Sequence, residues 1–508
     1  MLARIWSASL VGIDAVKVGV EVDVAGGLPG IVVVGLPDTA VQESRERVKA
    51  ALKNAGYAFP MRKVVINLTP ADLRKEGPSF DLPISVGILA ASEQVSTTLL
   101  DQYLFLGEVS LDGALRSVAG VLAIAAAAKK IGVQGMVVPA ANAREASVVK
   151  GLTVYGFEHL SEVADFLNQP DRYQPVQVNA QDKLVRSQFQ GLDLRDVKGQ
   201  AHARRALEIA ASGGHNLIFV GPPGSGKTML ARRLPGILPP LSFEEALEVT
   251  QIHSVAGLLK EKGTLVSDRP FRSPHHSASG PSLVGGGSFP KPGEISLAHR
   301  GILFLDELTE FKRDVLEFLR QPLEDGHVTI SRTRQSVSFP AQFTLVASTN
   351  PCPCGYFGDT IQACTCSPRQ REQYWAKLSG PLMDRIDLQV AVNRLKPEEI
   401  TQQPIGEESK SVRERVQVAR DRARQRFRNE PLRCNAELQS RHIRQWCQLD
   451  DASRGLLEGA IRKLGLSARA TDRILKVART IADLAGDEKL HPHHIAEAVQ
   501  YRTIDRMQ

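Results

Sequence analysis

The residues best suited to chemistry in this sequence form a glycine-rich loop that ends in lysine and threonine. The loop consists of Gly221, Pro222, Pro223, Gly224, Ser225, Gly226, Lys227 and Thr228. It fits the pattern G-x-x-x-x-G-K-[ST], with an apolar run before it and a helical stretch, 229–234, after it. Backbone N–H groups of such a loop wrap phosphates, the lysine reaches the β- and γ-phosphates, and the hydroxyl can hold Mg²⁺. The loop therefore predicts a nucleotide site with Thr228 as a magnesium ligand.

A second group of polar residues follows the apolar run 302–305, which is typical of a buried strand. Asp306 and Glu307 come directly after this run. Asp306 would hold Mg²⁺, and Glu307 would polarise the attacking water as a general base. A third apolar run, 343–349, ends at Asn350, whose amide could position water beside the γ-phosphate. The alternatives are an ordinary strand end with solvated acids and, for Asn350, a turn before proline.

Four of the six cysteines lie close together as two C-x-C pairs: Cys352 with Cys354, and Cys364 with Cys366. Four thiolates on two short turns can close a tetrahedral Zn²⁺ site, although C-x-C is tighter than the usual zinc spacing. In a reducing compartment such a cluster favours metal over disulfides. We expect structural zinc, with two free pairs or an iron–sulfur ligand set as alternatives. Metal binding is also open for the histidine motifs, which comprise His275, His276, His491, His493 and His494, but loop polarity and helix capping are the roles we expect for them.

These groups need a fold that brings them together, and the residue pattern predicts an α/β protein. At 508 residues the chain is long enough for about three domains. Residues 1–168 read as an α/β domain, 169–190 as a linker, 191–395 as a larger α/β domain with a parallel sheet, and 396–508 as helical. In the first domain we predict strands at 16–24, 31–34, 63–68 and 135–139 and helices at 41–55, 80–92 and 118–131.

The composition is that of a globular protein. Hydrophobic residues make up 43% and charged residues 23%, which excludes a wholly disordered or collagen-like chain. The net charge of +7 permits a nucleic-acid partner, and 5% aromatic residues argue against a repeated base-stacking platform. The longest apolar run, 118–128, is far short of the roughly 20 residues that cross a bilayer. Because no signal peptide is recognisable, we expect a cytoplasmic protein with no membrane partner.

Further motifs extend the pattern over essentially the whole chain. They are RPFRSPHH (269–276), GGG (285–287), KPGEISLAH (291–299), LRQPLEDG (319–326), NPCPCG (350–355) and LSGPLMDRID (378–387). With the loop, the acidic strand end and the helical tail, they resemble the AAA+ ATPases and, within them, the magnesium-chelatase-like ComM/YifB family. The resemblance implies an ATP- and Mg²⁺-dependent ring, a homohexamer, with a helical lid over 396–508. It also implies a DNA helicase that acts on single-stranded and branched DNA and promotes branch migration during natural transformation.

The same resemblance assigns arginines to the ATP site. Arg385 stands where such proteins carry the arginine finger, which stabilises charge on the phosphoryl group of a neighbouring subunit. Arg469 resembles the sensor-2 arginine of the lid, with Arg473 one turn further as the fallback. A salt bridge from Arg385 to Asp384 or Asp387, and a solvated helix charge for Arg469, are the alternatives.

The N-terminal domain resembles that of Lon-type proteases. The segment around Ser79 is similar to the stretch that carries the nucleophilic serine, and Leu122 stands where the catalytic lysine belongs. A serine needs an adjacent base to attack a peptide, and leucine cannot supply one. Lys129 and Lys130 lie about two turns further along the predicted helix. We expect a Lon-like fold without peptidase activity.

Two arginine-rich segments are candidates for DNA contacts. Residues 410–433 carry nine basic and three acidic side chains, and Arg420, Arg424 and Arg428 recur every four residues on one predicted helical face. Arg332 and Arg334 lie in a predicted hairpin, 327–339, of the kind that points into the pore of AAA+ rings. Nothing in either segment reads a base edge, so we expect sequence-independent binding through phosphates. The alternative for the first segment is a solvated lid helix.

Two other functions compete with a DNA motor. A magnesium-chelatase-type motor would remodel a protein partner carrying a D-x-S-x-S motif, which this chain lacks but another chain could supply. An AAA+ protease is the third possibility, and leucine at position 122 argues against it.

Overall fold

The computed structural model describes residues 2–73, 75, 77–177, 192–259, 265–287, 290–332, 335–395 and 406–502. The chain divides into two compact units. Unit 1 comprises residues 1–185, 243–266 and 331–339, and unit 2 comprises 186–242, 267–330 and 340–508. Segments 243–266 and 331–339 lie within the larger domain predicted at 191–395 but belong to unit 1.

Unit 1 contains a mixed seven-stranded sheet of order β3-β4-β2-β1-β5-β8-β9. Its strands are β1 (Leu2–Val11), β2 (Asp14–Ala25), β3 (Gly30–Val34), β4 (Lys63–Thr69), β5 (Tyr103–Phe105), β8 (Gly135–Pro139) and β9 (Thr153–Phe157). The four predicted strands are present. Strand β1 was not predicted, although it pairs with β2 along its whole length, from Leu2 opposite Asp23 to Val11 opposite Asp14.

Helices of unit 1 agree with the sequence pattern at the three predicted places. They are α1 (Thr39–Asn54), α2 (Asp81–Ala91), α3 (Val121–Ile131), α4 (Ala140–Ala146), α5 (Leu160–Asn168) and α9 (Phe243–Val255). Every residue of α2 is buried, so this helix forms the centre of the unit's core. The first part of the predicted linker also packs here, because the Tyr173 ring lies 5.4 Å from that of Phe157. The remainder, 178–191, lies outside the described residues.

Helix α9 comes from the middle of the chain and packs on α3 of the N-terminal segment. The Ser254 hydroxyl of α9 donates a hydrogen bond of 2.7 Å to the Glu145 carboxylate in α4, and both residues are buried. Glu145 also accepts from the backbone N–H of Leu122 at 3.3 Å. A polar contact buried in this way fixes the pairing of two segments that are far apart in sequence.

Unit 2 is built on a parallel five-stranded sheet of order β11-β14-β17-β10-β18. Its strands are β10 (Leu217–Val220), β11 (Phe271–Arg272), β14 (Ile302–Leu305), β17 (Thr344–Thr349) and β18 (Leu388–Ala391). Strands β10 and β14 are wholly buried, as their apolar runs predict. Because parallel strands end at the same edge, the segments that follow β10, β14 and β17 come together there.

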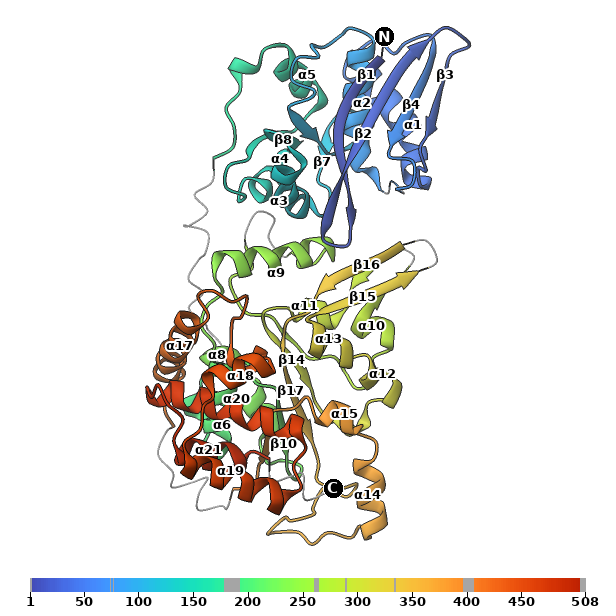
Figure 1. Cartoon of the computed structure of the whole chain (residues 1–508). Helices are drawn as coiled ribbons and strands as arrows, with labels where there is room; N and C mark the ends of the chain where they lie inside the picture. The colour runs from blue at the N-terminus through green and yellow to red at the C-terminus, as the bar shows by residue number, and fades with distance from the viewer. Residues whose placement is uncertain are drawn as a thin grey trace. The chain divides into compact units, whose positions relative to one another are not determined.

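The C-terminal helices belong to unit 2 and share one hydrophobic core with its sheet, which includes Leu217, Val416 and Ile474. In Figure 1 these helices, drawn in red, gather around α6 (Ala201–Gly213). They are α17 (Ser409–Arg426), α18 (Ser440–Trp446), α19 (Asp451–Leu464), α20 (Ala468–Ala485) and α21 (Pro492–Gln500). The helical composition predicted for 396–508 is confirmed for 406–502, where the chain is described.

Several shorter elements are also present, among them a hairpin whose second strand lies mostly in unit 1. Those used below are α7 (Lys227–Ala231), α13 (Arg320–Asp325), α14 (Pro368–Trp375), α15 (Gly380–Met383), β15 (His327–Arg332) and β16 (Gln335–Pro340). Strands β15 and β16 pair with each other, which confirms the predicted hairpin. Over the described ranges, no helix is both long and apolar enough to cross a membrane.

Candidate functional site

The glycine-rich loop connects β10 to α7 and holds its lysine inside the protein. Gly224 and Gly226 have φ angles of 77° and 93°, a conformation that strongly favours glycine. The Lys227 ammonium donates to the carbonyl oxygens of Gly221 at 2.6 Å and Pro222 at 3.0 Å. It also donates to Asn350 Oδ1 at 3.2 Å, so the loop that follows β10 meets the residue that follows β17.

Two features of this loop suit an incoming phosphate. Burial lowers the pKa of Lys227 to about 8, against the raising influence of Asp306 and Glu307, so an anion would restore the favoured charged form. The Ser225 hydroxyl oxygen is buried and has no hydrogen-bond partner within the described part of the chain. A phosphate oxygen would satisfy it, which supports the predicted role of the loop.

The predicted magnesium ligands lie side by side. The Thr228 hydroxyl donates to Asp306 Oδ2 at 2.8 Å, and the other oxygen, Oδ1, accepts from the Glu307 backbone N–H at 3.1 Å. The Ser348 hydroxyl of β17 donates to the same Oδ1 and orients the carboxylate. A hydroxyl and a carboxylate oxygen are the hard ligands that Mg²⁺ takes. Ser348 was not predicted, because the sequence analysis considered only Asn350, the residue that follows β17.

Glu307 faces outward beside this pair. Its backbone has φ 53°, and its side chain is 57% exposed, which leaves the carboxylate free to meet a water molecule. Nδ1 of His276 lies 3.7 Å from Glu307 Oε2. Loop polarity or helix capping was the expected role of His276, and its sequence motif did not predict this contact.

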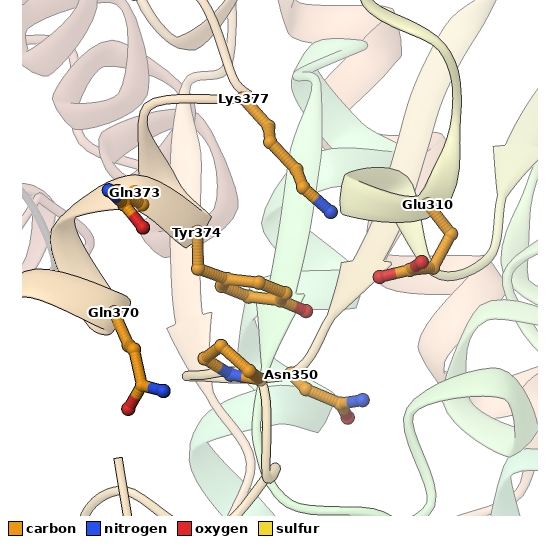
Figure 2. Close-up of a pocket in the computed structure, with 7 residues that line it drawn as sticks. Glu310, Asn350, Gln370, Gln373, Tyr374 and Lys377 are labelled. Atoms are coloured by element: carbon orange, nitrogen blue, oxygen red, sulfur yellow. The ribbon is translucent and has the colours of Figure 1, made fainter. Parts of the chain in front are cut away.

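Asn350 also lines a pocket of about 310 Å³ on the other side of the β17 end (Figure 2). The lining residues are Glu310, Asn350, Pro353, Gln370, Gln373, Tyr374 and Lys377. The hydroxyl of Tyr374, on α14, accepts a hydrogen bond of 2.6 Å from Thr309 and lies 3.4 Å from the Thr349 hydroxyl. Tyr374 therefore links the segment after Glu307 to the end of β17, a contact that the sequence did not predict.

The predicted arginines are not gathered at this site within one chain. The Arg385 guanidinium pairs with Glu324 of α13 and donates to the Pro381 carbonyl at 2.5 Å, so its partner is neither of the aspartates we considered. Arg469 is exposed in the first turn of α20. Arg473 instead pairs with Asp387, the residue before β18.

That aspartate is buried and is shared by Arg473, His215 and the backbone N–H of Asn216. Burial by itself would raise the pKa of Asp387, but Arg473 and His215 lower it well below the ordinary range. His215 Nδ1 lies 3.3 Å from the carboxylate. Because Arg473 belongs to α20 and Asp387 adjoins β18, this pair ties the helical region to the sheet.

The sulfur atoms of the four predicted zinc ligands form one cluster. This clustering argues against the alternative of two separate free cysteine pairs. Their sulfur atoms all lie within 4.8 Å of one another, with separations of 3.3 Å for Cys352–Cys354, 3.7 Å for Cys352–Cys364 and 3.6 Å for Cys354–Cys364. Tetrahedral zinc with its usual bond length places sulfurs about 3.8 Å apart, and a disulfide would place them near 2.0 Å. Burial would raise the pKa of the Cys354 thiol, but backbone N–H groups lower it to about 5. The arrangement can hold a metal.

Most arginines predicted to contact DNA either bond to other groups of the chain or lie outside the described residues. Helix α17 ends at Arg426, so the prediction that Arg428 shares its face is wrong. The guanidinium of Arg420 donates to the Ala211 carbonyl at 2.8 Å, and that of Arg424 lies 3.4 Å from Asp421. Arg332 ends β15, but its side chain and the whole of Arg334 lie outside the described residues.

Comparison with known proteins decides the family. Three family models match: magnesium chelatase subunit ChlI over 193–400, a second ChlI model over 20–142, and the ChlI C-terminal model over 406–502. The competence protein ComM of Haemophilus influenzae is 46% identical, and YifB of Salmonella typhimurium, described as uncharacterized, is 45% identical. Each alignment covers 100% of this chain and 98% of the relative. The chain belongs to the magnesium-chelatase-like ComM/YifB family.

The ComM/YifB assignment confirms an AAA+ domain on the parallel sheet of unit 2. Likeness to the chelatase subunits themselves is more distant. The magnesium-chelatase 38 kDa subunit of Cereibacter sphaeroides is 26% identical over 30% of this chain and 51% of its own length. In unit 1, Leu122 is buried, and Lys129 and Lys130 are exposed in the last turn of α3, so neither of these two lysines takes the place of Leu122. The Lon-like relationship stays a prediction.

Proposed function

We propose that this ComM/YifB protein is an ATP-driven, ring-forming DNA motor that promotes branch migration in homologous recombination during natural transformation. The observation that carries the proposal is the convergence of Lys227, Thr228, Asp306, Glu307 and Asn350 at one sheet edge. The full-length likeness to a protein named for competence supports the choice of DNA as substrate. We place its action in the cytoplasm.

The chemistry of the site follows from the polar groups of the chain. Thr228 and Asp306 would hold Mg²⁺, which when bound neutralises charge on the phosphates. Lys227 would exchange its carbonyl partners for phosphate oxygens, whose negative charge would oppose the lowering of its pKa by burial. Glu307 would accept a proton from the attacking water, and Asn350 would orient that water.

A ring would complete this site with an arginine from the neighbouring subunit. The side chain of Arg385 is 9% exposed. Its ion pair with Glu324 holds the guanidinium in a fixed position beside α15. We propose that it serves the ATP site of the neighbouring subunit of a homohexamer. Arg469, exposed at the start of α20, would serve the site of its own subunit as the sensor-2 residue.

We propose the β15–β16 hairpin as the main contact with single-stranded and branched DNA. It carries Arg332 and Arg334. Arg424 and Arg428 are exposed and could add contacts, while Arg420 is already bonded to a backbone carbonyl. Binding through phosphates would be sequence-independent and would weaken steeply with salt.

A DNA-dependence experiment tests this proposal. The full-length protein should hydrolyse ATP faster with forked DNA and should move the branch point of a four-strand junction, both only with Mg²⁺ and hydrolysable ATP. Changing Arg332 and Arg334 to alanine should remove most of the DNA stimulation, because the phosphate contacts are lost. Changing two exposed arginines of α19, Arg454 and Arg462, removes the same charge and should leave the stimulation intact.

The alternative is a magnesium-chelatase-type motor that remodels a protein partner, which the ChlI family models favour. A hydrolysis-competent oligomer whose turnover ignores DNA, and which neither separates strands nor moves branches, would establish that alternative over the DNA motor.

We also propose that the four clustered cysteines bind one structural Zn²⁺ per chain. Purified full-length protein should contain about one zinc per chain by metal analysis, and thiol modification should release it. The variant Cys364→Ser should retain less zinc, whereas Cys447→Ser, at a buried cysteine outside the cluster, should retain all of it. Iron with sulfide in place of zinc would favour the iron–sulfur alternative, and absence of any metal would remove the site.

A further inference from the structure

We propose that the zinc loop, residues 352–366 with metal bound, is a positioning element of the ATP site. In this role it holds Asn350 and the phosphate loop in the geometry that hydrolysis needs. The inference rests on the ATPase and zinc assignments proposed above and gives the metal a part in turnover.

The zinc loop begins two residues after Asn350 and turns back onto the phosphate loop. The Gly355 N–H donates to the Cys352 carbonyl at 2.9 Å, which closes the first cysteine turn. Gly355 has φ 89°, and a Cβ atom there would lie 2.7 Å from Cδ of Pro223. The backbone of the cysteine turn therefore rests directly on the phosphate loop, at a distance that only glycine permits.

Arg394 makes a second connection between the same two segments. Its Nε donates to the Pro223 carbonyl at 3.2 Å, and its Nη1 lies 3.5 Å from Asp359 Oδ2 in the zinc loop. Its guanidinium also lies 5.2 Å from the centre of the Tyr356 ring. The Asp359 side chain is 2% exposed, so this contact is shielded from water and from salt.

The far end of the zinc loop is tied to the same place through α14. This helix begins at Pro368, two residues after Cys366, whose carbonyl accepts a hydrogen bond of 3.0 Å from Arg371. One turn further, the indole N–H of Trp375 donates to the Pro351 carbonyl at 3.1 Å. Both ends of the loop thus meet beside Asn350.

The metal is what would make these connections rigid. Residues 352–366 are all described and contain neither helix nor strand, so regular backbone hydrogen bonds do not fix them. Four thiolates on one ion would close the loop and remove its freedom to shift. A displacement of about 1 Å at catalytic groups can cost roughly 10²-fold in rate. Loss of zinc should therefore loosen Asn350 and the Pro223 side of the phosphate loop together.

Reversible zinc removal from the full-length protein tests the proposal. Zinc is stripped with a mercurial thiol reagent and a chelator, the thiols are restored, and kcat and KM for ATP are measured without DNA. We expect kcat to fall at least about tenfold, because Asn350 acts at the γ-phosphate end, and ADP affinity to fall by less than that, because Lys227 stays in the phosphate loop. Adding Zn²⁺ back should restore kcat. Circular dichroism and sedimentation confirm that the stripped protein keeps its fold and assembly.

A variant pair guards against damage by the reagents. Cys364→Ser should reproduce the loss of kcat, although the contacts to Pro223 come from Gly355 and Arg394 and not from Cys364. Cys447→Ser, treated identically, should not. If Cys364→Ser does not fold, the stripped and reloaded wild type decides the question.

The outcomes separate the three assignments. Unchanged kcat in folded, zinc-free protein overturns the positioning role and leaves zinc and ATPase activity standing. Protein that never contains metal overturns the zinc site and the positioning role but not the ATPase. Zinc-loaded protein without turnover overturns the ATPase assignment and this inference with it.

Discussion

The Glu307→Gln protein should bind ATP normally and turn it over about 10²- to 10⁴-fold more slowly than the unchanged protein. Glutamine keeps the shape of the side chain and cannot accept a proton from water. Lys227, Thr228 and Asp306, the groups proposed to bind the phosphates and Mg²⁺, are held by contacts that do not involve the Glu307 carboxylate, so affinity should persist. Binding of a fluorescent ATP analogue and release of phosphate measure the two effects separately.

The matched control is Glu317→Gln, which changes an acid paired with Arg320 away from the loop. Its turnover should equal that of the unchanged protein. Equal turnover by the Glu307→Gln protein would exclude Glu307 as the base. In that case Asp306 alone would carry the acidic chemistry of the strand end.

Replacing Arg385 by alanine should lower turnover about 10³- to 10⁵-fold if the guanidinium acts on a neighbouring subunit. ATP should still bind, since Arg385 pairs with Glu324 and not with the phosphate loop of its own chain. Mixing Arg385→Ala with Glu307→Gln protein should restore part of the turnover. Rings of mixed composition contain some boundaries at which an intact Glu307 faces an intact Arg385.

The control mixture replaces the second partner by the double variant, which lacks both groups and should recover nothing. The Glu324→Gln variant adds a second check, because it releases Arg385 from its ion pair but keeps the arginine. A finger should keep working after that change. If mixed rings of proven composition stay inactive, Arg385 holds α13 to α15 and does no more.

The ATP site was largely predictable because local sequence determines it. A glycine-rich turn followed by a helix, and acids or amides directly after buried apolar runs, report both the element and its chemistry. In a parallel sheet those ends meet at one edge, so Lys227 and Asn350 came together as expected despite their separation in sequence. The four cysteines were similarly marked by spacing alone.

Residues that act through long-range contacts were not predictable in this way. Ser348 is one of several small residues inside β17, and only the fold reveals that it faces Asp306. Tyr374 and His276 look ordinary on their own segments, and their partners lie far away in the chain. The arginine-rich stretch gave a partly wrong prediction, because its periodicity is a local pattern and its contacts are not. Periodicity describes a helix face but does not show that Arg420 donates to a carbonyl of α6 or that the helix ends before Arg428.

The membership of α9 in unit 1 has a practical consequence for anyone who wants the ATPase part alone. A protein cut before residue 186 would lose α3 and Glu145, yet it would keep α9 and the buried side chains Ala246, Val249 and Ile252. That helix would then present an uncovered apolar face and the unpaired hydroxyl of Ser254 to solvent. Such a fragment should aggregate, and a soluble version would need 243–266 removed as well.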